Sequence, residues 1–246
     1  MKIALAALGF INGNIERNTN VVLRTLEKLK DEADLVIFGE TFLQGFDGLA
    51  WEYEKDLSNA LSLKDSRIRQ IQSKVQETRV AISLGLFELY EGKLYDSQIA
   101  IDKDGKIIHV YRRISASWKE EFVKDPRYAE GDHFSAFALM GKTFLVALCG
   151  DLWYEDILEK AKQEESDYVI WPVYLDYNAD RWNNEEKFAY RDQAALLSRP
   201  TFLVNCYCID KEDISYYSKG GACYFDHGEI IKEIPSGDEG ILLFDL

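Results

Sequence analysis

The chain has 246 residues, of which 47% are hydrophobic and 13% aromatic, so it is long enough to bury one large core. Its formal net charge is −14 at pH 7, which argues against nucleic acid and anionic membrane surfaces as partners, because both attract clustered cations. It contains no run of about 18 apolar residues of the kind that spans a membrane. We therefore expect one globular domain over residues 1–246, with a small molecule as its ligand.

Strands and helices alternate in the first part of the chain. The short apolar N-terminus carries a single Lys and leads into Asn12-Gly13-Asn14, so it predicts a core strand and not a signal peptide. Asn14 is a candidate N-cap for the next helix, whose apolar stripe includes Val22, Leu26 and Leu29. The elements predicted here are strands over 2–8, up to 38 and over 80–86, and helices over 15–30 and 64–78.

The second part begins with a predicted hairpin, which pairs 97–101 with 106–111 through an Asp-Gly turn. The charged, irregular segment 115–131 follows, and long loops of this kind are often functional. The order fits two β-rich layers covered by helices, although periodicity alone does not exclude a doubly wound sheet. The remaining predicted elements are strands over 143–148, 167–171, 201–208, 221–225, 230–234 and 241–244, and helices over 155–165 and 185–198.

Reactive groups follow three of these strands. Cys149 ends an apolar run, where a thiol can act as a nucleophile and the following backbone N–H groups can hold an oxyanion. Glu40 follows a strand and Gly39, where partial desolvation would raise its pKa toward that of a general base. Arg112 and Arg113 end the strand after the Asp-Gly turn. Taken singly, each has an ordinary explanation: a buried core cysteine, a solvated loop acid and a solvated basic pair.

In this order the three segments resemble the carbon–nitrogen hydrolase (nitrilase) superfamily, which uses a Glu, a Lys and a Cys at or near strand ends. The matching stretches are Gly39-Glu40, Gly105 to Arg113 and Cys149 to Glu155. The resemblance continues downstream and covers nearly the whole chain. The residues that carry it there are Trp171-Pro172, Trp182, Arg191, Ala194, Asn205, Gly220-Gly221-Ala222 and Asp226-His227-Gly228-Glu229.

The resemblance implies both a fold and an activity. The fold is an α+β (α/β) four-layer α-β-β-α sandwich, assembled as a homodimer or higher homo-oligomer. The activity is hydrolysis of a non-peptide carbon–nitrogen bond in a small aliphatic amide or an N-carbamoyl compound. It proceeds through a thioester on Cys149, with Glu40 as the general base. Acyl transfer to an amine and a non-enzymatic scaffold are rival interpretations.

One position departs from the family pattern, because Arg113 stands where the family has its catalytic Lys. Arginine keeps the positive charge, but its pKa is too high for easy proton donation and its planar fork is larger than an ammonium group. Lys119 lies six residues further on and reaches the site only if the chain folds back. Three alternatives stay open: Arg113 fills the role, Lys119 fills it, or neither does and the protein binds a ligand without turnover.

The resemblance also implies a second Glu in the loop after the Lys. Glu120 and Glu121 are the candidates, and a solvated acidic loop is the ordinary alternative. We favour Glu121 as the catalytic acid, although no physical argument separates the two. The residues expected by position to contact substrate are Trp118, Glu120, Asp151, Trp153 and Tyr174.

Cysteine and histidine usage bears on the compartment and on cofactors. The four cysteines are too few for a disulfide framework, so a reducing cytoplasm is the simplest compartment. Cys206 and Cys208 share one strand face and are expected to be packing residues. The three histidines lie in different segments and no phosphate-binding motif occurs, so the sequence predicts neither a metal nor another cofactor.

Overall fold

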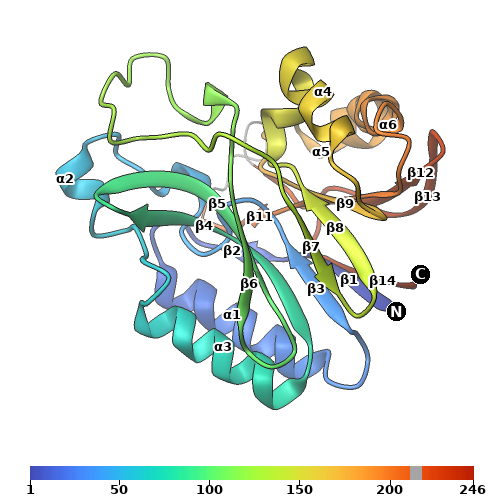
Figure 1. Cartoon of the computed structure of the whole chain (residues 1–246), viewed down its shortest axis with the longest axis horizontal. Helices are drawn as coiled ribbons and strands as arrows, with labels where there is room; N and C mark the ends of the chain where they lie inside the picture. The colour runs from blue at the N-terminus through green and yellow to red at the C-terminus, as the bar shows by residue number, and fades with distance from the viewer. Residues whose placement is uncertain (211–217) are drawn as a thin grey trace.

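The computed structural model describes residues 1–210 and 218–246. Two six-stranded sheets pack face to face, and helices cover the outer face of each (Figure 1). This is the four-layer α-β-β-α sandwich that the family resemblance predicted, so the predicted fold is confirmed. No helix in the described residues is both long enough and apolar enough to cross a membrane.

In the first sheet the N-terminal strand lies next to an edge strand that comes from the C-terminus. Strands β1, β3 and β4 run parallel, and the others are antiparallel to their neighbours. In spatial order the strands are β14 (Gly240–Asp245), β1 (Lys2–Ala7), β3 (Leu35–Phe38), β4 (Ala81–Tyr90), β5 (Lys93–Ile101) and β6 (Ile107–Arg112). All of β3 is apolar, because it is buried on both faces.

The second sheet has the same number of strands, with β8, β9 and β10 parallel. Its strands in spatial order are β13 (Glu229–Ile234), β12 (Ala222–Asp226), β10 (Thr201–Asn205), β9 (Tyr168–Val173), β8 (Lys142–Val146) and β7 (Ala136–Leu139). A separate parallel pair joins β2 (Gly9–Phe10) to β11 (Tyr207–Cys208).

Helices α1 (Ile15–Lys28) and α3 (Ser66–Thr78) cover the first sheet, and α4 (Glu155–Gln163) and α6 (Lys187–Ala195) cover the second (Figure 1). The predicted N-cap of α1 is confirmed, because the Asn14 side chain accepts a hydrogen bond from the backbone N of Arg17 at 3.1 Å. The short helical elements are η1 (Phe46–Gly48), α2 (Tyr53–Asp56), η2 (Ala116–Trp118), η3 (Cys149–Trp153), α5 (Ala179–Arg181) and η4 (Trp182–Glu186).

Alternation along β1 separates two hydrophobic cores. Ile3 and Leu5 lie in the core between the sheets, whereas Ala4 and Ala6 lie in the core under α1 and α3. The inter-sheet core has aromatic residues such as Phe144 on the opposing sheet. Since both faces of this sheet are buried, the ends of its strands are held rigidly, which suits a site built there.

The predicted boundaries that differ most from the structure belong to three regions. Strands β4 and β5 are longer than predicted and form a hairpin that was not predicted, because the polar residues Glu88 and Asp96 interrupt the apolar pattern although both are buried. The predicted strand 201–208 breaks after Asn205. The predicted helix 185–198 ends at Ala195 and is preceded by α5 and a π-helical turn.

The charged segment after β6 is anchored by two aromatic side chains. Trp118 and Tyr128 are each 1% exposed and pack with Phe87 of β4 in a third hydrophobic cluster. Tyr128 also donates a hydrogen bond from its hydroxyl to Asp56 Oδ2 at 2.6 Å. This segment lies on the same side of the molecule as α2 (Figure 1). We expected Trp118 to contact substrate, and the structure places it in the core.

Replacing Trp118 by Ala should therefore lower the free energy of unfolding by about 3–5 kcal/mol, because it empties a packed site. Phe122→Ala is the matched control on the same segment, since Phe122 is 69% exposed and its removal should change stability by less than about 0.5 kcal/mol. Denaturant unfolding, monitored by far-ultraviolet circular dichroism of the backbone, measures both free energies. Equal effects of the two changes would contradict the anchoring role.

Candidate active site

Glu40 lies directly after β3 and is 1% exposed. Its turn packs against β4 at Gly85, where a Cβ atom would lie 2.4 Å from the backbone N of Thr41. Glu40 Oε2 accepts a hydrogen bond from the backbone N of Tyr174 at 2.8 Å, and Oε1 accepts one from Arg113 Nη1 at 2.9 Å. Burial raises the pKa of Glu40, while the Arg113 charge opposes that rise. A buried carboxyl with a raised pKa suits a general base.

Arg113 follows β6, and its guanidinium is buried beside Glu40. Nε donates a hydrogen bond to Ser115 Oγ at 2.8 Å, and Nη2 donates one to Ser117 Oγ at 2.8 Å. With the bond from Nη1 to Glu40, every nitrogen of the fork has a partner. The two serines are functional neighbours that we did not predict.

Cys149 opens η3 with a backbone φ of 36°, a left-handed conformation that is strained for a residue with a side chain. Its carbonyl accepts a hydrogen bond from Trp171 Nε1 at 2.9 Å, and its Sγ–H donates to the carbonyl of Tyr174 at 3.8 Å. Burial, and after it the charge of Glu40, raises the pKa of the Cys149 thiol. The resting group is therefore a thiol that needs a base to remove its proton.

Gly150, which follows Cys149, leaves room for the Arg113 guanidinium. A Cβ atom at this position would lie 2.4 Å from Arg113 Nη2 and 2.6 Å from Ser117 Oγ. The guanidinium therefore packs directly against the peptide unit that follows Cys149. A larger residue at this position would have to displace the guanidinium or the Ser117 hydroxyl, since real Cβ atoms do not come within 3 Å of other heavy atoms.

Asp151 holds the Cys149 turn through hydrogen bonds to backbone N–H groups. Oδ1 accepts hydrogen bonds from the backbone N of Ile114 at 3.1 Å and of Ser115 at 2.8 Å. Oδ2 accepts one from the backbone N of Leu148 at 2.9 Å and one from the Tyr111 hydroxyl at 2.6 Å. We expected Asp151 to contact substrate, but it is fully buried and joins the segment after Arg113 to the Cys149 turn.

A second buried carboxyl, Asp96 of β5, lies beside Arg113 and was not predicted. The backbone N of Arg113 donates to the Asp96 carbonyl at 2.9 Å, and Asp96 Oδ2 lies 3.6 Å from Arg113 Nη1. Our hairpin prediction paired 97–101 with 106–111, whereas in the structure a bulge between Ala100 and Ile101 shifts the register and Ser97 lies opposite Arg112. The predicted register therefore did not place Asp96 beside Arg113.

The predicted alternative cation and acids lie elsewhere. Lys119 Nζ pairs with Glu130 and donates a hydrogen bond to the Tyr128 carbonyl at 3.1 Å. Glu120 and Glu121 are exposed on the same segment. Within the part of the chain that the structure describes, no hydrogen bond or ion pair joins these three side chains to Glu40, Arg113 or Cys149.

Three aromatic side chains pack together near the Cys149 turn. The ring centroids of Trp153 and Tyr190 lie 5.0 Å apart, and those of Trp171 and Tyr190 lie 5.2 Å apart. Burial, and after it the charge of the Cys149 thiolate, raises the pKa of Tyr190, which was not predicted. Trp153 is 44% exposed, so it alone of these three presents a large accessible face.

Tyr174 links the site to a surface loop. Its backbone N binds Glu40, and its hydroxyl donates a hydrogen bond to Asp47 Oδ2 of η1 at 2.6 Å. Its ring stacks on Phe46 with centroids 5.2 Å apart. Of the five residues expected to contact substrate, Tyr174 bonds through its backbone to both Glu40 and Cys149, and Trp153 lies in the same short helix as Cys149.

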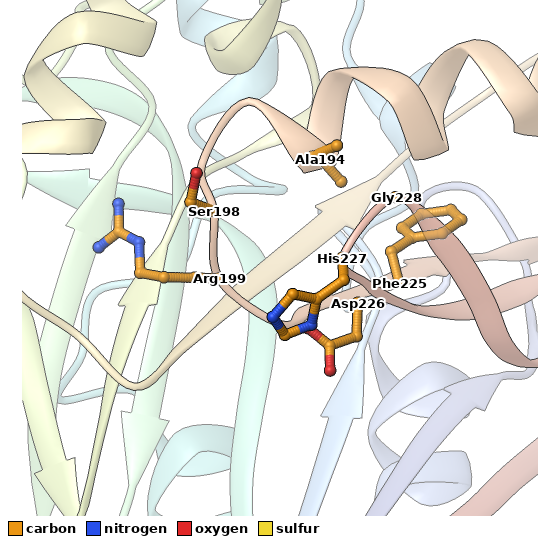
Figure 2. A pocket seen from close by; sticks show the side chains of 8 residues that line it. Ala194, Ser198, Arg199, Phe225, Asp226, His227 and Gly228 are labelled. Atoms are coloured by element: carbon orange, nitrogen blue, oxygen red, sulfur yellow. The ribbon is translucent and has the colours of Figure 1, made fainter.

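A cavity of about 310 Å³ between the end of α6 and the β12–β13 hairpin is separate from these residues (Figure 2). Arg199 is the cation in its lining, and its Nη groups already bind the Ala161 carbonyl and the Ser166 hydroxyl near the end of α4. His227 pairs with the adjacent Asp226. None of the predicted site residues lines this cavity.

Known proteins resemble this chain in sequence and in fold. An (R)-stereoselective amidase of Pseudomonas sp is 25% identical over 170 residues, covering 69% of this chain and 59% of the amidase. A nitrilase of Penicillium rubens is 25% identical over an alignment of 266 residues, covering 93% of this chain and 79% of the nitrilase. The solved structure of a glutamine-dependent NAD⁺ synthetase of Acinetobacter baumannii superposes with a TM-score of 0.80 at 23% identity, covering 98% of this chain and 44% of the synthetase.

The chain thus spans less than two thirds of the length of the amidase and of the synthetase. The structural match shows a shared fold. The sequence profile of the carbon–nitrogen hydrolase family matches residues 2–246, which is nearly the full length given. Since that match extends over all three strand ends that carry Glu40, Arg113 and Cys149, the chain belongs to the carbon–nitrogen hydrolase family.

Proposed function

We propose that this protein hydrolyses the carbon–nitrogen bond of a small amide or N-carbamoyl compound through a thioester on Cys149. The observation that carries the proposal is the joining of three strand ends. Glu40 binds Arg113, and the Arg113 guanidinium packs on the peptide after Cys149. These contacts support a mechanism in which a base, a cation and a thiol act on one carbonyl group.

In the first step the Cys149 sulfur attacks the substrate carbonyl carbon. The thiol proton passes to Glu40, and the π electrons of the carbonyl move to its oxygen. In the second step the carbonyl re-forms, the carbon–nitrogen bond breaks, and the leaving nitrogen takes the proton from Glu40. Water then attacks the thioester and gives its proton to Glu40, which returns it to the departing thiolate sulfur.

Arg113 is our choice for the group that stabilises the oxyanion. The guanidinium has five N–H donors, of which the bonds to Glu40, Ser115 and Ser117 use three. A fixed cation beside the reacting carbon stabilises the charge that develops in the transition state. Lys119 is the weaker candidate because Glu130 and the Tyr128 carbonyl hold its Nζ.

Two observations support the proposed substrate class. The exposed ring of Trp153, which packs on Tyr190, favours an acyl group with apolar surface. Relatives named as an amidase and as a nitrilase support a compound with one non-peptide carbon–nitrogen bond. Binding without turnover is the second candidate, and its basis is the Arg in the family Lys position.

We also propose that the protein is a homo-oligomer and that it is cytoplasmic. Light scattering of the purified chain tests the oligomeric state.

Glu40→Gln should lower kcat for amide hydrolysis by about 100- to 10,000-fold, because a neutral amide cannot accept the thiol proton. Cys149→Ser should lose at least as much. Ammonia release from a panel of short aliphatic amides and N-carbamoyl compounds measures the rate. Cys223→Ser is the matched control on β12, and its rate should stay close to wild type. Unchanged turnover in either site variant, with the fold retained, would remove the thioester mechanism.

Arg113→Lys should lower kcat by about 100- to 1000-fold, since one ammonium cannot replace the three directed bonds of the guanidinium. The control is Lys119→Met, which keeps the length of the side chain and removes the alternative cation. Its kcat should match wild type. A rate that rises in Arg113→Lys, or that collapses in Lys119→Met, would transfer the role away from Arg113.

A further inference from the structure

Asp96 is the buried group that the mechanism above leaves unused. It is 1% exposed, and with every carboxyl group ionised neither Oδ1 nor Oδ2 has a hydrogen-bond donor in the described residues. Its closest cation is Arg113 Nη1 at 3.6 Å, too long for a hydrogen bond. Its carboxyl does lie beside that of Glu40, near enough for a hydrogen bond that requires a proton on one of the two.

The buried charges support a retained proton. Arg113 supplies one positive charge to two carboxyl groups, Glu40 and Asp96. The third, Asp151, already accepts four hydrogen bonds and needs no further donor. An unpaired carboxylate away from water is costly, and such a group keeps its proton instead. Burial, and after it the charge of Glu40, raises the pKa of Asp96 well above its ordinary value.

Hydrogen bonding decides which carboxyl is ionised. Glu40 accepts bonds from the Tyr174 backbone N and from Arg113, and both favour its charged form. Asp96 has no such donor. The ionisable groups that face this pair are Arg113, Asp151, Tyr111, Cys149, Cys206 and Tyr190.

We propose that Asp96 is a positioning residue of the active site that holds one proton and shares it with Glu40, leaving Glu40 as the ionised base. Glu40, Asp96 and Arg113 then carry no net charge together. The Asp96 proton stays in place while Glu40 takes and returns the proton of the thiol. The role in catalysis rests on the proposed function, whereas the shared proton does not.

Infrared difference spectroscopy of wild type against Asp96→Asn tests the proton directly. Asparagine has the shape of a protonated aspartate, is neutral and also donates to Glu40. The difference spectrum at pH 7 should contain the C=O stretching band of a protonated carboxyl group, shifted in D₂O. Absence of that band would overturn the proposal, whatever the enzyme does with amides.

Thermal unfolding across pH gives a second, independent reading. A carboxyl whose pKa is raised in the folded state binds more protons there than in the unfolded chain, so its contribution to stability falls as pH rises above the unfolded value of about 3.9. The Tm of Asp96→Asn minus the Tm of wild type should therefore increase from pH 4 to pH 7, an interval of about three pH units above the unfolded pKa of aspartate. A difference that is constant or shrinks would contradict the retained proton.

Alkylation of Cys149 by iodoacetamide, followed by mass spectrometry, tests the positioning role without a substrate. Asp96→Asn should label within about threefold of wild type at pH 7, about half a pKa unit, because it preserves the donor. Asp96→Ala removes the donor and should slow labelling by about tenfold. Equal rates in both variants would leave Asp96 without a positioning role. If the carboxyl band is present but no amide is hydrolysed, the proposed function fails and the shared proton stands.

Discussion

A guanidinium removed from water needs a counter-charge and acceptors for its N–H groups, and this requirement at Arg113 organises the centre of the molecule. Glu40 supplies the charge, and Ser115 and Ser117 supply hydroxyl oxygens. Glu40 follows β3 and Arg113 follows β6, and these strands are separated in the sheet by β4 and β5. The ion pair therefore spans the width of three strand spacings and fixes the two loops relative to each other.

That constraint reaches the thiol through rigid contacts. Asp151 ties the backbone after Arg113 to the backbone before Cys149, and the indole of Trp171 holds the Cys149 carbonyl. Because these bonds exist before a substrate arrives, little reorganisation remains for the reaction itself. The strained backbone of Cys149 is maintained by the same contacts.

The fold was predictable from sequence where residues alternate or run apolar without interruption, as in β1, β3 and β8. The grouping of Glu40, Arg113 and Cys149 followed from the resemblance of their three segments to the carbon–nitrogen hydrolase family. Asp96 was missed because a buried polar residue interrupts the apolar pattern of a strand, and in the sequence of that strand alone such an interruption resembles a turn. Trp118 and Asp151 were assigned to substrate because position along the chain does not reveal whether a side chain points into the core. Neither Ser115 nor Ser117 carries a pattern that distinguishes it from a loop serine.

The contact between Gly150 and the guanidinium couples substitutions at positions 113 and 150. A side chain at position 150 and an arginine at position 113 compete for the same space, since the Cβ would lie 2.4 Å from Nη2. A lysine at 113 has a thinner end and leaves part of that space open. A change at either position therefore alters which side chains the other position can hold.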